Sequence, residues 1–279
     1  NLGIFQKIYI LFYFFSRKID TVYILTPKNF YYYLPYIFRW IKFYAITIKS
    51  KKSRPNNFLK KYLYKYVVID RLNLKKRKSS YVTQKELVEP YFKSDDTQNL
   101  HINYPVNHKF NYPKKYIFFH YKHSLFNGLL NWKLEQIVSL LDFFSKKNYH
   151  VLFSSEIFNK PINNYFEKQF NTYDYNTNKN ITINTKKIIF LKDIDGFNLF
   201  DAVKKSSLII CPEGIISHMS YFLNKPLLAL IHFRLKNHED FKDQLISCKE
   251  WFPPNNYKYT VLKKDYFQSL RKINARIKF

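Results

Sequence analysis

The chain has 279 residues, of which 46% are hydrophobic and 20% aromatic, and its 47 Lys+Arg against 20 Asp+Glu give a formal net charge of +27. That apolar content excludes a disordered chain, and the length suits one large domain or two smaller ones. The two cysteines, Cys211 and Cys248, exclude a disulfide scaffold and a cysteine-based zinc site. We therefore expect a reducing compartment.

The positive charge has two interpretations. Clustered Lys and Arg are typical of nucleic-acid-binding proteins. Here the excess is mainly Lys, and it accompanies abundant Asn, Ile, Tyr and Phe, which are the residues that A/T-rich codons encode. Genome composition therefore explains the charge without a ligand, and we favour a protein without a nucleic-acid partner.

No segment predicts a membrane span or a signal peptide. Ile8 to Phe15 is strongly apolar, but Lys7 and Arg17-Lys18 leave it far short of the roughly 20 residues that a span requires. Basic residues each gain about 1 kcal/mol near an anionic leaflet. We expect a cytoplasmic protein that can contact an anionic membrane face peripherally.

The first part of the chain predicts a βαβ unit. A strand at Thr21 to Leu25 is followed by a helix at Phe30 to Ile41 and a second strand at Phe43 to Ile48, which favours a parallel sheet. The stretch from Lys49 to Lys78 is densely basic, and residues 1–108 carry a net charge of +14. Ser94 to Pro113 is polar, lacks helical periodicity, and is expected to link two domains, 1–108 and 109–279.

The second part alternates strands and helices more regularly. We predict strands at 116–120, 150–154, 188–191, 208–211, 227–231 and 257–262, helices at 132–147, 162–170, 197–205, 217–223 and 264–277, and loops at 121–131 and 171–184. This rhythm indicates an α/β fold with an open, doubly wound parallel sheet. Such sheets bind ligands beyond the carboxyl ends of their strands.

The most informative segment runs from Phe200 to His232. Between a strand and a helix it reads Cys211-Pro212-Glu213-Gly214-Ile215-Ile216-Ser217-His218, and Asn224-Lys225-Pro226 leads into the next strand. With only 4 glycines in the chain, a glycine at the head of a helix between an acid and a histidine indicates a functional turn.

This segment resembles the donor-binding half of GT-B glycosyltransferases, most closely the bacterial ADP-heptose:lipopolysaccharide heptosyltransferase family. In that family a strand, an acidic residue, small residues and a His open a helix, and Glu213, Gly214 and His218 stand at matching positions. Ile215 stands where Gly or Pro is usual, and Ser217 where an apolar residue is common. Glu156 follows Ser154-Ser155, where the family ends its second strand with small residues and an acid.

The resemblance implies two Rossmann-like domains and an inverting transfer from a nucleotide sugar to a cell-envelope glycan or lipid-linked acceptor, with no cofactor and no bound metal. A diphosphate leaving group suits the N–H groups that open a helix. Gly214 would let phosphate approach the backbone, and Ser217 would cap the helix or contact phosphate. His218 would donate to a phosphate oxygen, and Lys122 would add a cation. Glu213 would accept hydrogen bonds from donor hydroxyls.

Each of these residues also has an ordinary structural explanation. His218 could be a buried structural histidine, Glu213 a solvated turn acid, and Lys122 one lysine among many. His120 and His123 have an H-x-x-H spacing but no neighbouring acid or cysteine that would complete a metal site.

Asp193-Ile194-Asp195 resembles the metal-binding D-x-D of a different glycosyltransferase fold, and we interpret it as part of a loop. In the resembled family the acceptor domain begins with a strand and a glycine-containing loop that carries the general base. No such sequence precedes Asp20. The resemblance therefore implies that the N-terminal domain is incomplete and that the general base lies in a missing segment. The alternative is a non-catalytic GT-B-like protein or a basic nucleic-acid-binding protein.

Overall fold

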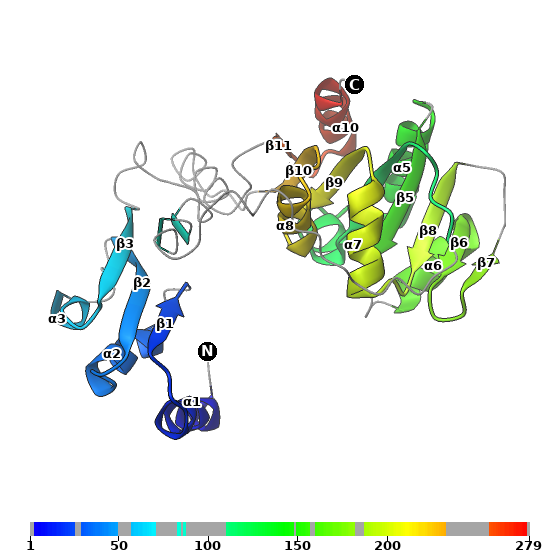
Figure 1. Ribbon diagram of the computed structural model, residues 1–279. Helices are drawn as coiled ribbons and strands as arrows, with labels where there is room; N and C mark the ends of the chain where they lie inside the picture. The colour runs from blue at the N-terminus through cyan, green and yellow to red at the C-terminus, as the bar shows by residue number, and fades with distance from the viewer. Residues whose placement is uncertain are drawn as a thin grey trace. The chain divides into compact units, whose positions relative to one another are not determined.

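The computed structural model describes residues 3–25, 29–49, 57–70, 83–84, 86–87, 110–147, 149–156, 160–181, 187–232 and 257–277. These residues fall into two compact units, one built from the described residues up to 87 and the other from those starting at 110 (Figure 1). The domain boundary near residue 108 that the sequence predicts lies outside the described residues and stays a prediction.

The first unit is a three-stranded parallel sheet in the order β1-β2-β3. Its strands are β1 (Thr21–Ile24), β2 (Lys42–Lys49) and β3 (Lys65–Asp70), and its helices are α1 (Ile4–Ser16), η1 (Asn29–Tyr33), α2 (Leu34–Ile37) and α3 (Asn57–Lys60). Strand β2 is central and buried over most of its length. Its Phe43 and Ala45 pack with Tyr32, Phe38 and Ile41 in one core cluster. The predicted parallel βαβ unit is confirmed.

The structure corrects two sequence predictions in this unit. The single helix predicted over residues 30–41 is instead the short 3-10 helix η1 followed by α2, because Pro35 starts a new helix and the last turn ends at Phe38. Strand β3 was not predicted, since it lies within the basic stretch. It alternates between more and less exposed positions and is buried only at Ile69.

The second unit is an eight-stranded sheet in the order β11-β10-β9-β4-β5-β8-β6-β7 (Figure 1). The parallel strands are β4 (Tyr116–Tyr121), β5 (His150–Ser155), β6 (Asn171–Asp174), β8 (Ile188–Lys192), β9 (Leu208–Pro212), β10 (Leu227–Ile231) and β11 (Tyr257–Val261), and β7 (Lys179–Ile181) is antiparallel to β6. The predicted open, doubly wound α/β sheet is confirmed.

Helices cover both faces of this sheet. They are the π-helix η4 (Ser124–Leu129) and the α-helices α5 (Leu134–Ser145), α6 (Lys160–Gln169), α7 (Gly196–Lys205), α8 (Ile215–Phe222) and α10 (Tyr266–Arg276). Helices α5, α6 and α10 share one hydrophobic cluster with the strands. Figure 1 shows α7 on the opposite face of the sheet from α5. Because both faces are covered, β10 is buried along its whole length, as parallel strands usually are.

Two predicted loops of this unit contain regular structure. Residues 171–184 include the β6–β7 hairpin, in which Asp174 Oδ1 accepts hydrogen bonds from the N–H groups of Asn176 and Thr177. The Asn-rich composition suggests a loop, yet Thr172 and Tyr173 are buried. Residues 121–131 contain η4, whose Leu125 and Phe126 pack into the core.

Four described residues other than glycine adopt the left-handed conformation: Asn131, Asn178, Asp193 and Asn224. None of the four glycines does so. Asparagine and aspartate tolerate this conformation better than other L-residues, because their short side chains can hydrogen-bond locally. In this chain they occupy turns where glycine is the common choice.

Within the described residues, no helix is both long enough and apolar enough to cross a membrane.

Candidate donor-binding site

The strand order in the sheet of the second unit reverses between the neighbouring strands β4 and β9. From β4 the chain continues to β5 on one side, whereas from β9 it continues to β10 on the other. The two strands are direct neighbours, with Phe118 opposite Ile209. Open parallel sheets bind ligands at such a switch point, beyond the carboxyl ends of the strands. The residues that follow β4 and β9 there are Lys122 and Glu213.

Lys122 joins these two chain segments. Its Nζ donates a hydrogen bond to the backbone carbonyl oxygen of Glu213 at 3.2 Å. Burial and, to a smaller extent, the charge of Lys122 together lower the pKa of His120 to about 4. Burial raises the pKa of the Cys211 thiol, and Lys122 opposes that shift. A positive potential therefore reaches the carboxyl ends of both strands, which suits an anionic ligand.

Helix α8 begins directly after this contact, with Gly214 as its N-cap. The hydroxyl of Ser217 donates to the Gly214 carbonyl oxygen at 2.7 Å, and the Gly214 N–H donates to Ser217 Oγ at 3.4 Å. Ser217 is fully buried. The Ser217 hydroxyl thus helps to fix the start of α8. Of the two roles that the sequence suggests for Ser217, capping the helix and contacting phosphate, these hydrogen bonds agree with capping.

Gly214 has an extended backbone, and a Cβ built on it would meet no atom within 4 Å. The protein's own packing therefore does not require glycine at this position, whereas a ligand lying against the backbone would benefit from one. Ile215 opens the helix with its side chain 64% exposed. Its apolar side chain cannot bind phosphate, so its contribution is limited to its backbone N–H at the positive end of the helix dipole.

His218 lies one turn into α8 and is half-buried, while Glu213 is exposed. Burial lowers the pKa of His218, and the neighbouring Glu213 charge opposes the shift. The imidazole is therefore neutral at pH 7 and carries one N–H. A neutral imidazole donates a hydrogen bond to a phosphate oxygen without the desolvation cost of a buried cation.

Glu156 follows β5 and reaches the segment after β4. Its Oε2 accepts a hydrogen bond from the His123 backbone N–H at 3.1 Å. Burial raises the pKa of the Tyr121 hydroxyl, and the Glu156 charge raises it further. The Tyr121 hydroxyl donates to Asn127 and lies 3.3 Å from His123 Nδ1. Glu156 thus helps to fix the loop that carries Lys122.

His120 is a residue whose place in the site the sequence does not reveal. Its Nδ1 lies 3.0 Å from Ser154 Oγ, because β4 and β5 pair in a register that sets these two residues side by side. His120 and His123 make separate contacts, with Ser154 and Tyr121. Their H-x-x-H spacing therefore reflects adjacent positions at a strand end. In the sequence, His120 is marked by this spacing and by its position as a polar residue at the end of an apolar strand.

The D-x-D sequence has a structural role at Asp195. Its carboxylate caps α7, accepting from the N–H groups of Phe197 and Asn198 at 2.8 and 2.9 Å. Asp193 accepts a hydrogen bond from Asn176 at 3.1 Å. Across the part of the chain that the structure describes, no three His, Cys, Asp or Glu side chains are grouped so that they could hold a metal ion.

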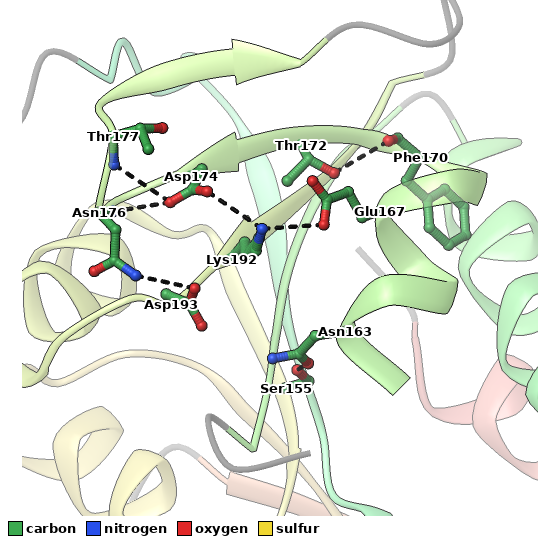
Figure 2. Close-up of polar contacts among 10 residues, drawn as sticks. All are labelled: Ser155, Asn163, Glu167, Phe170, Thr172, Asp174, Asn176, Thr177, Lys192 and Asp193. Atoms are coloured by element: carbon green, nitrogen blue, oxygen red, sulfur yellow. Dashed lines mark hydrogen bonds and ion pairs between the residues drawn. The ribbon is translucent and has the colours of Figure 1, made fainter. Parts of the chain in front are cut away.

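A second polar cluster joins α6 to the ends of β6 and β8, and Figure 2 shows it. Lys192 Nζ lies 3.0 Å from Glu167 Oε2 and 3.3 Å from Asp174 Oδ2. Burial lowers the pKa of Lys192, but the two carboxylates raise it more, so the net shift is upward. The lysine charge is compensated inside the protein, and the cluster is structural.

The architecture is the GT-B fold of glycosyltransferases. No protein-family model matches the sequence, and no curated protein sequence matches it. Solved structures do match it. The glycosyltransferase family 9 structure from Veillonella parvula DSM 2008 has 15% identity and a TM-score of 0.58, and the match covers 100% of this chain and 74% of that one.

Two further matches concern differently named enzymes. The E. coli heptosyltransferase WaaC, solved with ADP-2-deoxy-2-fluoro heptose, has 9% identity and a TM-score of 0.57 over 94% of this chain and 72% of that one. The UDP-GlcNAc 2-epimerase from Methanocaldococcus jannaschii has 10% identity and a TM-score of 0.51 over 98% of this chain and 76% of that one. At these identities the similarity establishes the fold, and one fold serves more than one chemistry.

Proposed function

We propose that this protein is a glycosyltransferase that moves a sugar from a nucleotide-sugar donor to a cell-envelope glycan or lipopolysaccharide-type acceptor, with inversion. The observation that carries the proposal is the contact between Lys122 and Glu213 at the switch point of the sheet, next to the start of α8. It brings a cation, free helix N–H groups and His218 to the edge where such sheets bind nucleotides.

These groups match the charge that develops during transfer. When the glycosidic bond to the donor breaks, the nucleoside diphosphate leaves with an added negative charge. Lys122 and the N–H groups that open α8 stabilise this charge, and the His218 N–H adds a hydrogen bond. Glu213 and Glu156 accept hydrogen bonds from donor hydroxyls. The site supplies its positive charge from its own residues, in keeping with a transferase that uses no cofactor and no metal.

The named activities of the structural neighbours support a nucleotide sugar as the ligand class. These neighbours include the E. coli ADP-heptose LPS heptosyltransferase II and a UDP-GlcNAc 2-epimerase, whose names each contain a nucleoside diphosphate sugar. The epimerase likeness also favours a second candidate, in which the sugar is altered on the nucleotide and no acceptor is used. The site residues serve both reactions, since each must hold the diphosphate.

The proposal for the acceptor rests on the positive charge of the first part of the chain. Residues 1–108 carry a net +14, which suits a phosphorylated, lipid-linked glycan presented at an anionic membrane. The first domain would then be the acceptor side and residues 109–279 the donor side, with the protein at the cytoplasmic face of the membrane.

Calorimetric titration of the purified chain with ADP, UDP and GDP, and with their sugar conjugates, tests the donor site. Lys122→Met should weaken binding of the preferred diphosphate by about tenfold or more, since hydrogen bonds to charged groups contribute roughly 1.5–3 kcal/mol. Gly214→Ala should also weaken it, because the added Cβ would keep the phosphate away from the backbone. His218→Ala should weaken it less, because a neutral donor is lost. Lys168→Met is the matched control, because this exposed lysine ends α6 and is not at the switch point.

Absence of binding by every diphosphate would contradict the proposal. Conversion of UDP-GlcNAc to an epimer without acceptor would favour the second candidate. Salt-sensitive RNA or DNA binding that is unaffected by Lys122→Met would support a nucleic-acid-binding protein instead.

A further inference from the structure

Helix α1 is apolar over most of its surface, and only one side is packed. Ile10, Leu11 and Phe14 contact the core of the first unit, yet no residue of the helix is fully buried. The opposite side exposes Ile4, Phe5, Ile8, Tyr9, Phe12, Tyr13 and Phe15, with Phe5 84% and Phe12 68% accessible. We call these seven residues the outer face of α1. A helix that is apolar all round is normally covered on both sides.

The outer face continues onto a neighbouring segment. The ring of Phe15 lies 6.3 Å from that of Trp40, which is 65% exposed. Phe38, buried beneath, packs against both Phe15 and Trp40 and fixes their positions. The exposed apolar surface thus includes a tryptophan and, at its border, tyrosines. Both residue types are enriched at membrane–water interfaces.

The charged residues in this part of the chain are almost all positive. Residues 1–69 contain 13 Lys and Arg but a single acid, Asp20. Arg17 and Lys18 follow the helix directly and are exposed, and the Arg17 guanidinium lies 5.9 Å from the centre of the Tyr13 ring. Arg39 is exposed beside Trp40. The apolar surface therefore has a cationic border.

We propose that the outer face of α1, with Trp40, docks this protein onto an anionic lipid surface. Apolar and aromatic side chains would enter the boundary between headgroups and acyl chains, and Arg17, Lys18 and Arg39 would contact the anionic headgroups. A second copy of the chain is a poorer occupant, because two such borders would bring like charges together. This inference names the surface for the membrane contact proposed above and does not depend on donor binding.

The dimensions of the helix agree with this geometry. Thirteen residues of α-helix extend about 20 Å, less than the roughly 30 Å of a bilayer core. The helix therefore lies in the interface plane, with its inner side still packed on the first unit.

Co-sedimentation with vesicles tests the inference on the whole chain. We expect binding to phosphatidylcholine vesicles that contain phosphatidylglycerol and much weaker binding to phosphatidylcholine alone. The double variant Phe5→Ser/Phe12→Ser should lose about tenfold or more of its vesicle affinity, since it removes two large apolar contacts. Arg17→Gln/Lys18→Gln should lose about fivefold per cation on anionic vesicles only. Phe267→Ser is the matched control, because this phenylalanine is 70% exposed on α10 of the other unit.

Unchanged vesicle binding by the Phe5→Ser/Phe12→Ser variant would overturn the inference, as would equal binding to both kinds of vesicle. A dimer in solution that this variant dissociates would also overturn it in favour of a second copy. Nucleoside diphosphate titration of the same variant should match the unmodified protein. Loss of vesicle binding can therefore be distinguished from loss of nucleoside diphosphate binding.

Discussion

His120 shows how one side chain can connect the site to the stability of the fold. It ends an apolar strand, contacts Ser154 on the next strand, and lies close enough to Lys122 for that charge to affect its titration. Burial is the main reason that its pKa falls to about 4. The folded protein therefore keeps this imidazole neutral where the unfolded chain would protonate it.

The stability of the second unit should consequently depend on pH. Since the folded pKa of His120 lies below the unfolded value of 6.5, its contribution is complete above pH 6.5 and is lost as pH falls toward 4. The loss amounts to about 3 kcal/mol at most. Urea denaturation across this range should show a smaller pH dependence in His120→Asn, which keeps a polar partner for Ser154. An unchanged pH dependence in that variant would contradict the assignment.

Among individual residues, the sequence predicts those of the candidate site that are close together along the chain. Glu213, Gly214 and His218 lie on one turn and one helix start, so local sequence is enough to group them. The contacts of Lys122 with Glu213 and of His120 with Ser154 join residues 91 and 34 positions apart. Such pairs depend on strand order and register, which a sequence pattern alone does not determine.

Among the elements, α7 has the most sharply defined start. Asp195 accepts from two backbone N–H groups and from the Asn198 side chain at 2.7 Å. The helix begins with this carboxylate at the positive end of its dipole, which is the position that favours an acid. The second Asp of the D-x-D sequence therefore contributes to folding.

Asp195→Ala should lower the free energy of unfolding by about 1–2 kcal/mol, the range measured for loss of an N-cap. Asp195→Asn should retain most of the stability, because an asparagine oxygen caps almost as well. Thermal denaturation of both variants checks this. Equal losses in the two variants would show that charge, and not capping, is what matters at this position.

The elements also show why sequence patterns succeed or fail. Strands β4, β5, β9 and β10 are predicted because they are continuous apolar runs buried on both faces. Strands β3 and β7 lie at sheet edges, and lysine and asparagine replace apolar residues there and in the adjoining β6. Edge strands need only one paired neighbour and so leave a weaker signature.

For the whole molecule, each unit has a hydrophobic core of its own. Calorimetry should therefore resolve two unfolding transitions, and a nucleoside diphosphate should raise the temperature of only one of them. At a ligand concentration of about 100 times Kd the stabilisation is roughly 2.7 kcal/mol.

Fluorescence can assign the two transitions. Of the two tryptophans in the part of the chain that the structure describes, Trp132 is buried in the second unit and Trp40 is exposed in the first. Trp132→Phe should therefore reduce the emission change of the ligand-sensitive transition. A single transition that ligand shifts as a whole would mean that the two units unfold together.

The left-handed asparagines have a consequence for how this chain could be altered. Turns at residues 131, 178 and 224 use asparagine in a conformation that glycine adopts at no steric cost. The chain therefore holds these turns against a small local strain, which at Asn178 is offset by the hydrogen bond that its Oδ1 accepts from the Tyr173 hydroxyl at 3.1 Å. A glycine at position 131 would relieve this strain, whereas a glycine at position 178 would also remove the hydrogen bond from Tyr173.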